Sequence, residues 1–504
     1  MPLAELSTVC RKLQAEGRRV ALCHGVFDLL HAGHLRHLEA ARQQGDVLVV
    51  TVTCDEYVNK GPDRPAFGEE LRAEMLAALD LVDYVAIVHE PSATVAIDAV
   101  RPAAYIKGGE YDDLEKDITG KIVVEKEAVE RHGGALVFTH DVTFSSSNLL
   151  NRFFSVGDGD ARDYLESVGR DGLAERLDDL FARIAKLRLL IVGETIIDRY
   201  IYVDALGKSA KENIIATHHR GEELFAGGVI AAANHLAALC PNIELVTTVG
   251  SPNLGENYET FARESLDKSI TPYFFESPES PTVQKTRFVE PTHVQKLFEV
   301  YHMNDQPLSV QGTEEFQKLL RARMVEVDAV IVCDFGHGAI QGSSIQVLTE
   351  NAKFLAVNAQ SNAGNIGYNL VNKYTRADFL CIDTMEARLA VQEKHADPAV
   401  IADGKLQALV QAPNIVITHG KHGCYASNGD RVTHIPAFAS NVIDTVGAGD
   451  AFFVAAAAVM AAGGECVDAA FLGNVAGGLK TAIVGHRRAL TKLELQRYIQ
   501  TLLK

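Results

Sequence analysis

Short apolar runs alternate with amphipathic stretches over the first 140 residues of the chain. The stretches GHLRHLEAARQQG and GEELRAEMLAALD have the spacing of apolar residues that is typical of helices. Because the apolar runs between such stretches show no strict polar alternation, they indicate a parallel sheet that helices cover on both faces. We therefore predict one α/β domain over residues 1–150. Its candidate strands are residues 19–23, 46–52, 83–88, 103–107 and 135–140.

A second set of candidate strands begins after a charged interval. Residues 151–186 have helical periodicity, many charged side chains and no strand candidate, which predicts a helical linker. From residue 187 to Lys504 the alternation of strands and helices resumes and predicts a second, larger α/β domain. Its candidate strands are residues 187–198, 328–335, 354–359, 378–383 and 414–420.

Composition and charge narrow the class of protein. The 504 residues carry a formal net charge of −18, and so acidic a chain is not expected to bind nucleic acid, which requires basic surfaces. No apolar run reaches the roughly 20 residues of a membrane span, and the N-terminal sequence has no apolar signal segment. The 8 cysteines lie far apart without a CxxC pair, which argues against zinc or disulfide frameworks. We expect a cytoplasmic protein that binds neither nucleic acid nor a membrane.

The stretch CHGVFDLLHAGH at residues 23–34 is the first candidate site. It places His31 and His34 three positions apart at the predicted start of a helix, directly after a buried strand. The free N–H groups and positive dipole of such a helix end favour phosphate, and Gly25 permits close approach of a ligand to the backbone. Two alternatives remain open: a metal site, which would need a third ligand, or two surface histidines near a helix cap. Asp28 either orients a histidine or caps a turn.

Four motifs in order resemble the cytidylyltransferase-like nucleotidyltransferases. HAGH matches the HxGH signature of that family, and NKGPDRP, YIKGGEY and FSSSNLLN follow as its later motifs. The resemblance implies a Rossmann-like domain that uses Mg²⁺ and ATP or CTP, transfers AMP or CMP to a phosphate oxygen and releases pyrophosphate. It assigns His31 and His34 to the triphosphate, whose developing charge they would stabilise. The other implied nucleotide- and phosphate-binding residues are Gly25, Phe27, Lys60, Arg64, Lys107, Ser145, Ser146 and Ser147.

The segment NVIDTVGAGDAF at residues 441–452 is the second candidate site. It resembles the DTxGAGD signature of the ribokinase-like, or PfkB-family, sugar kinases. Gly447 and Gly449 open a predicted helix, so their N–H groups would form an anion hole for the transferred phosphoryl group. Asp450, at the same helix start, would accept the proton of a sugar hydroxyl as general base. The alternative is a glycine-rich turn that only caps a helix.

Further segments resemble landmarks of the same kinase family. VGETIIDRY, FAGGVIAAANHLAAL and THGKHG match its opening strand, its Gly-Gly motif and its ATP loop. The implied ATP site and anion hole consist of Thr418, Gly420, Gly423, Thr445, Gly447, Ala448, Gly449 and Asn474. The implied sugar contacts come from Asp198, Gly227 and Gly228. The resemblance also implies that Glu386 holds Mg²⁺ through water.

Four departures from the kinase pattern leave the sugar open. In GGVIAAANH the asparagine falls later than in relatives with the sequence GGAAN. Glu194 stands where an Asp is usual, and Asp383 stands where the family's NxxE motif has Asn. The segment VNAQSNAGNIGYN at residues 357–369 replaces the simple VDPKG of heptose kinases. Because Asp450 and its glycines are unchanged, the phosphoryl chemistry itself is expected to be intact.

The pairing of the two halves resembles the bifunctional enzymes of ADP-heptose synthesis, in which the kinase comes first; here the nucleotidyltransferase comes first. It implies an ATP-dependent kinase for a heptose-like sugar and a nucleotidyltransferase for the sugar phosphate. The alternatives are a degenerate kinase half that regulates or dimerises the N-terminal enzyme, and a nucleotide sensor without chemistry. Residues 199–220 and 283–300 would supply a small β lid, through which we expect a homodimer.

Overall fold

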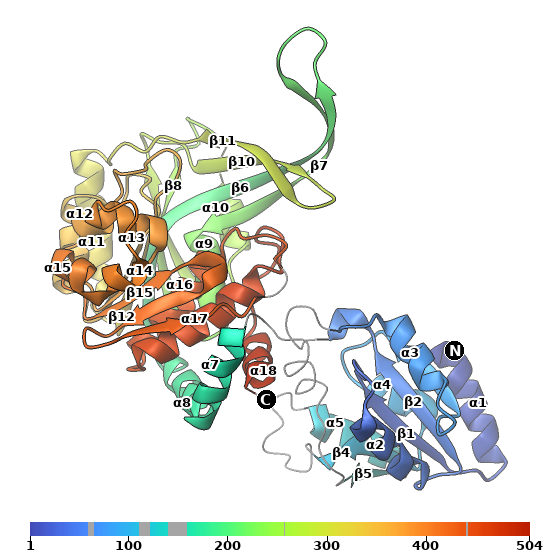
Figure 1. Cartoon of the computed structure of the whole chain (residues 1–504). Helices are drawn as coiled ribbons and strands as arrows, with labels where there is room; N and C mark the ends of the chain where they lie inside the picture. Colours follow the sequence, from blue (N-terminus) through green and yellow to red (C-terminus); the bar gives the residue numbers. More distant parts are fainter. Residues whose placement is uncertain (59–64, 110–120, 140–158, 257, 440–441, 504) are drawn as a thin grey trace. The chain divides into compact units, whose positions relative to one another are not determined.

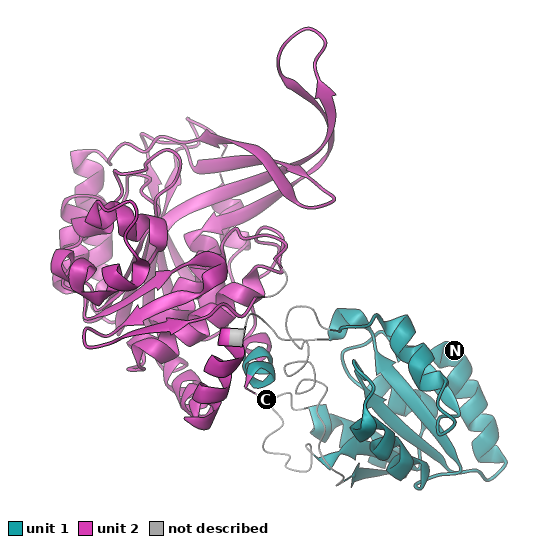
Figure 2. Ribbon diagram, in the orientation of Figure 1, with its two compact units in different colours: residues 1–155, 496–502, 504 teal, residues 156–495, 503 magenta. Residues whose placement is uncertain are grey.

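The computed structural model describes residues 1–58, 65–109, 121–139, 159–256, 258–439 and 442–503. It divides into two compact units, shown in different colours in Figure 2. The first comprises residues 1–155 with 496–502 and 504, and the second comprises residues 156–495 with 503. No helix among the described residues is both long and apolar enough to cross a membrane.

The first unit is built on a five-stranded parallel sheet (Figure 1). The strand order is β3-β2-β1-β4-β5, so β1 lies at the centre and the chain reverses its direction of travel across the sheet there. All five strands begin and end within three residues of the predicted ones, which confirms the parallel sheet. The strands are β1 (Val20–Gly25), β2 (Val47–Thr53), β3 (Tyr84–Val88), β4 (Ala104–Gly108) and β5 (Ala135–Thr139).

Helices cover both faces of this sheet, because every strand-to-strand connection must return over one face. One apolar core lies between the sheet and α1 (Leu3–Ala15), α4 (Thr94–Val100) and α5 (Lys121–Arg131). A second core lies under α2 (Ala32–Arg42) and α3 (Glu69–Ala77) on the opposite face. This arrangement confirms the Rossmann-like architecture of the N-terminal half.

Arg72 on α3 is fully buried and holds the carboxyl ends of β1 and β2 in place. Its Nε donates to the Phe67 carbonyl at 2.8 Å and its Nη2 to the Thr53 carbonyl at 2.9 Å. Nη2 also pairs with the Asp55 carboxylate at 2.6 Å, and Nη1 donates to the Val26 carbonyl. A buried guanidinium is tolerated only when its donors are satisfied in this way.

Arg72→Met is expected to destabilise the first unit by about 3–5 kcal/mol, because methionine keeps the bulk but leaves buried carbonyls without donors. Scanning calorimetry measures this as a lower unfolding temperature. Arg11→Met, at an exposed position on α1, is the matched control and should stay within about 0.5 kcal/mol of the wild type. An equal effect of both substitutions would contradict the structural role of Arg72.

The second unit contains a larger mixed sheet. Its strand order is β9-β8-β6-β12-β13-β14-β15-β16-β17, with parallel pairing from β9 to β15 and antiparallel pairing beyond. The strands are β6 (Leu189–Lys208), β8 (Ile243–Gly250), β9 (Ile270–Ser277), β12 (Ala329–Asp334), β13 (Leu355–Ala359), β14 (Phe379–Asp383), β15 (Asn414–Thr418), β16 (Cys424–Ser427) and β17 (Val432–Ile435).

A small β layer leaves the main sheet through β6, as the sequence predicts for a lid (Figure 1). The second half of β6 pairs antiparallel with β7 (Ile215–Gly228) and parallel with β10 (Val283–Glu290). β11 (Gln295–His302) pairs antiparallel with β10. We call these strands, with residues 195–208 of β6, the clasp.

Helices pack on both faces of the larger sheet. α8, α9, α16 and α17 contact one another on one face, and α11, α12 and α13 cover the large apolar core of the other. The helices of this unit are α7 (Gly159–Arg170), α8 (Leu173–Ile184), α9 (Val229–Ala237), α10 (Glu259–Glu264), α11 (Val310–Met324), α12 (Ser343–Asn351), α13 (Thr384–Val391), α14 (Pro398–Val400), α15 (Leu406–Leu409), α16 (Ala448–Ala461) and α17 (Cys466–Lys480). The last helix, α18 (Lys492–Leu502), has residues assigned to each unit.

The segment expected to be a helical linker, residues 151–186, contributes structure to the second unit. α8 buries an apolar stripe that includes Leu177, Leu180 and Phe181. Its Arg176 forms an ion pair with Asp468 of α17 at 3.0 Å. The compact second unit therefore begins before residue 187, because the apolar face of α8 needs a partner that a free linker would not provide.

Candidate active sites

The HAGH stretch lies at the carboxyl end of the central strand of the first unit, where β1 leads into α2. Ligands bind at this edge of parallel sheets. His31 is the N-cap of α2, and its Nδ1 accepts a hydrogen bond from the Gly33 N–H at 3.1 Å. The rings of His31 and His34 stack with their centroids 4.0 Å apart. The structure thus brings the two predicted histidines together at a helix N-terminus.

Phe27 shapes the turn that precedes these histidines. Its φ of 48° is unusual for a residue other than glycine, and its buried ring lies 5.4 Å from that of His34. A Cβ on Gly25 would lie 3.3 Å from the Phe27 ring, so a larger residue there would crowd the turn. Asp28 is buried and accepts from the Ala66 N–H at 2.5 Å, which places it in the turn.

The metal alternative for this stretch finds no third ligand among the residues that the structure describes. Only Cys54, Glu69 and His89 form a group of three metal-ligating side chains there, and that group contains neither His31 nor His34. Phosphate binding by these two histidines stays a prediction.

The other predicted residues of the first unit differ in their placement. Lys107, at the end of β4, forms an ion pair with Glu125 at 3.0 Å. His24 lies between Thr51 and Thr53, and burial lowers its pKa to about 3, which makes it a structural residue. The residues Lys60, Arg64, Ser145, Ser146 and Ser147 lie outside the described part of the chain.

Asp450 lies in the first turn of α16, as the DTVGAGD motif predicts. Gly447 is the N-cap of this helix with a φ of 77°, and no side chain caps the N–H groups that follow. Asp450 is buried, and its Oδ1 accepts from Gln360 Nε2 at 2.5 Å. Burial raises the pKa of Asp450, and the Gln360 hydrogen bond opposes this rise. A base with a raised pKa beside free helix N–H groups suits phosphoryl transfer.

Asp198, on the clasp end of β6, is the second acidic group of this site. Burial would raise its pKa, but the interactions with His486 and Arg287 outweigh burial and lower the pKa to about 2. A Cβ on Gly227 would lie only 2.1 Å from Asp198 Oδ2. The first glycine of the Gly-Gly motif therefore lets the carboxylate lie against the backbone.

Lys285 is a third charged residue of this site. In the parallel register of β10 and β6, the backbone of Lys285 lies beside that of Asp198. Lys285 is buried, with an exposure of 8%. The charges of Asp198 and Asp450 raise its pKa, although burial lowers the pKa overall. Within the described residues its ammonium group contacts the Tyr301 ring but forms no hydrogen bond.

Two family models match the chain. The model of cytidylyltransferase-like proteins matches residues 22–152, and the model of pfkB family carbohydrate kinases matches residues 186–492. The second match covers more than half of the chain. The protein belongs to the pfkB family of carbohydrate kinases. It carries a cytidylyltransferase-like domain on the N-terminal side of the pfkB domain.

Similar proteins bear the name bifunctional protein HldE. The one from Trichlorobacter lovleyi is 41% identical over 131 residues, which is 26% of this chain and 25% of that protein. The one from Geobacter sulfurreducens is 43% identical over 123 residues, 24% of each chain. The match thus spans about a quarter of the length of these relatives. Among solved structures, a phosphofructokinase-2 mutant from Escherichia coli covers 63% of this chain and 100% of its own, with 13% identity and a TM-score of 0.51, which supports the fold alone.

The segment THGKHG, which the sequence predicts to line the ATP site, begins where β15 ends. Thr418 ends β15, and Gly420 and Gly423 have φ angles of 54° and 87° that favour glycine. Asn474 of α17 is buried and donates to the Pro436 carbonyl at 2.6 Å. Its amide therefore holds the segment after β17 in place. The sequence predicted a position near the adenine and did not predict this contact.

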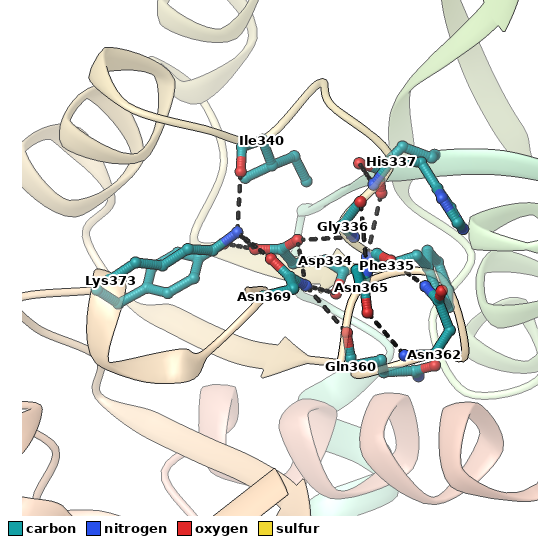
Figure 3. A network of polar contacts seen from close by, with 12 residues as sticks. Asp334, Phe335, Gly336, His337, Ile340, Gln360, Asn362, Asn365, Asn369 and Lys373 are labelled. Atoms are coloured by element: carbon teal, nitrogen blue, oxygen red, sulfur yellow. Dashed lines mark hydrogen bonds and ion pairs between the residues drawn. The ribbon is translucent and has the colours of Figure 1, made fainter. Parts of the chain in front are cut away.

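Figure 3 shows a polar network around the turn after β12, to which the asparagine-rich segment contributes. Glu194 binds the same turn. Glu194 accepts from the N–H groups of Phe335 and His337 at 3.2 Å each, and burial raises its pKa. Asn365 and Asn362 both donate to the Phe335 carbonyl at 3.1 Å. The longer glutamate thus reaches the turn after β12, and the amides hold the same turn from the other side.

A second part of this network surrounds Asp334 at the end of β12. Its carboxylate pairs with Lys373 at 2.6 Å and accepts from the Tyr374 hydroxyl at 2.7 Å. Asn369 donates to Asp334 Oδ1 at 3.1 Å and to the Gln360 carbonyl at 3.0 Å. Since Gln360 holds Asp450, the asparagine-rich segment connects the β12 turn to the proposed base.

Sequence reasoning missed Gln360 and Lys480. The cluster of amides in VNAQSNAGNIGYN was the available signal for Gln360. Lys480 is fully buried, and its ammonium donates to the carbonyls of Val446 at 2.8 Å and Ile483 at 3.3 Å. Burial lowers its pKa to about 8. It fixes the turn that precedes the α16 glycines, and no local pattern marks it.

Glu386 begins α13 in a capping box with Asp383. Its carboxylate accepts from the Asp383 N–H and from the Ser361 N–H at 2.8 Å each. Burial, with the nearby charge of Asp383, raises its pKa. The Ser361 hydroxyl beside it is buried without a partner in the described residues. An orphaned hydroxyl near carboxylates fits a hydrated Mg²⁺, because that ion prefers oxygen ligands and retains water.

Proposed function

We propose that the chain is a bifunctional enzyme that makes a nucleotide-activated sugar. In this proposal the pfkB domain phosphorylates a heptose-like sugar with ATP, and the cytidylyltransferase-like domain transfers AMP or CMP to the resulting sugar phosphate. The observation that carries the proposal is Asp450, buried at the uncapped start of α16 and held by Gln360. The HldE relatives support the combination of two activities in one chain, because their name describes them as bifunctional.

The proposed kinase step uses Asp450 as the base. The sugar hydroxyl attacks the γ-phosphorus of ATP while Asp450 accepts its proton. A new O–P bond forms, and the bond between the γ-phosphorus and the β–γ bridging oxygen breaks with ADP as leaving group. The N–H groups at the start of α16 stabilise the charge of the transferred group. Mg²⁺, held by Glu386 through water, would neutralise phosphate charge.

The buried ammonium of Lys285 supports a sugar that already carries an anionic group. The charges of Asp198 and Asp450 act on this cation, but its ammonium group has no hydrogen-bond partner among the described residues. A phosphate or carboxylate on the sugar would supply that partner. A heptose phosphate carries such a group.

The nucleotidyl step requires no covalent intermediate. An oxygen of the sugar phosphate attacks the α-phosphorus of the nucleoside triphosphate, and pyrophosphate leaves. His31 and His34 contact the triphosphate at the start of α2 and stabilise its charge. The family model is described only as cytidylyltransferase-like, which does not specify the nucleotide. ATP and CTP are therefore both candidate donors.

The deciding experiment has two arms. The first measures ADP formation from ATP with heptose 7-phosphate, and the second measures pyrophosphate release from heptose 1-phosphate with ATP or CTP. Turnover in both arms is expected. Pyrophosphate release without kinase turnover would favour the second candidate, a nucleotidyltransferase whose pfkB domain only regulates or dimerises. No turnover with any sugar phosphate would overturn the proposal.

We also propose that the chain forms a homodimer through the clasp. The hairpin of β6 and β7 carries three exposed apolar side chains. They are Leu206, Ile214 and Ile215, with exposures of 68%, 57% and 72%. Such a patch on projecting strands is typical of an interaction surface. Light scattering is expected to give twice the mass of one chain, and Ile215→Asp is expected to give the monomer mass. A monomeric wild type would contradict the dimer.

A further inference from the structure

His486 lies between the two glycine motifs of the pfkB domain, although no motif includes it. A Cβ on Gly447 would lie 2.5 Å from its Cε1 and 3.2 Å from its Nδ1. A Cβ on Gly227 would lie 3.3 Å from its Nε2. The imidazole ring therefore contacts the anion-hole glycine with one edge and the sugar-side glycine with the other.

The position of this ring is fixed from both sides. Nε2 lies 3.4 Å from Asp198 Oδ2, and both side chains are buried, with exposures of 6% and 4%. The preceding residue, Gly485, donates its N–H to Asp444 of the DTVGAGD motif at 2.8 Å. The loop that carries His486 is thus anchored to the same motif that supplies the anion hole.

The other ring nitrogen has no partner in the part of the chain that the structure describes. Nδ1 of His486 is buried and forms no hydrogen bond with any described residue. Asp450 lies close enough for the charge of His486 to lower its pKa. A buried ring nitrogen without a partner is costly, and this one belongs to a ring that lies among Asp198, Gly447 and Asp450. In the proposed kinase step, the transferred phosphoryl group lies at the helix start that Gly447 caps.

We propose that His486 is a further catalytic residue of the kinase, whose imidazolium donates a hydrogen bond from Nδ1 to the transferred phosphoryl group. Asp198 holds the ring by accepting from Nε2 and stabilises its charge. The imidazolium keeps its proton throughout: Asp450 takes the proton of the sugar hydroxyl, and ADP leaves with the electron pair of the broken P–O bond. The role rests on the proposed kinase function and adds one donor to the anion hole.

The test compares two substitutions at one position. In His486→Asn the amide nitrogen lies as many bonds from Cβ as Nδ1, whereas in His486→Gln it lies as far as Nε2. His486→Gln is expected to lower kcat by about 10²–10³-fold, the usual effect of losing one such donor, with both KM values within about threefold. His486→Asn is expected to keep at least about tenfold more activity than His486→Gln.

A second readout requires no sugar. Aluminium fluoride with Mg²⁺ and ADP mimics the transferred phosphoryl group, and its affinity, measured by calorimetry, is expected to fall in His486→Gln in proportion to kcat. Equal affinity in the wild type and in His486→Gln, or equal kcat in the two substitutions, would overturn the assignment of Nδ1. Wild-type protein that binds the mimic but phosphorylates no sugar would instead count against the proposed function, so the two failures are distinguishable.

Discussion

Asp450→Asn is expected to reduce the kinase turnover number by at least about 10³-fold, because an amide cannot accept the proton of the sugar hydroxyl. The substitution preserves the size of the side chain, and the α16 turn is fixed by Gly447 and by Lys480. Substrate binding is therefore expected to change little. ADP formation from ATP and heptose 7-phosphate, measured at saturating substrate, gives the value.

The same protein supplies the control for this substitution. Pyrophosphate release by the cytidylyltransferase-like domain should stay at the wild-type rate in Asp450→Asn, since Asp450 belongs to the other unit. If the wild type forms ADP and Asp450→Asn forms it as fast, Asp450 is not the base. The glycine-rich turn would then be only a helix cap.

His34→Ala is expected to slow pyrophosphate release by about 10²–10³-fold, the loss typical of one donor that stabilises a developing charge. The His34 ring stacks on His31 with a centroid distance of 4.0 Å, so its removal also loosens the second phosphate ligand. Kinase turnover should be unchanged. A coupled pyrophosphate assay with heptose 1-phosphate and either ATP or CTP measures the effect.

The matched control is His37→Ala, one turn further along α2. His37 Nδ1 lies 2.9 Å from the Thr139 hydroxyl, so this histidine is expected to be structural and its substitution to keep turnover within a few fold of the wild type. Equal losses in His34→Ala and His37→Ala would show that α2 is merely sensitive to substitution. Unchanged turnover in His34→Ala would remove this residue from the site.

The sequence alone determined the architecture because its signals are local. Apolar runs without alternation, separated by amphipathic helices, can only be buried in a parallel sheet with two covered faces. The same holds for the two helix starts: a glycine-rich turn after a strand and before a helix creates an anion site wherever the rest of the chain lies. HAGH and GAGD therefore mark the two candidate sites through local sequence alone.

The sequence also showed where it departs from its family, but not the reason. Glu194 and the segment at 357–369 differ from the kinase pattern, and only the structure reveals that they support the same turn after β12. Separate departures of this kind compensate each other through contacts that are distant along the chain. A single sequence contains no sign of such pairing.

Tertiary structure alone decided which side chains complete the kinase site. Arg287 and His486, which contact the predicted Asp198, come from β10 and the loop after α17, and Gln360, which holds the predicted Asp450, follows β13. The hydrogen bond from Arg287 to Asp198 spans 89 residues of the chain, and that from Gln360 to Asp450 spans 90. Helix and strand propensity, capping and periodicity act over a few positions of the chain. They therefore predict where a helix or strand lies in the sequence, but not which other element packs against it. The partners of a buried charge are chosen only when the sheet closes and water leaves, because only then does each unpaired group carry a cost.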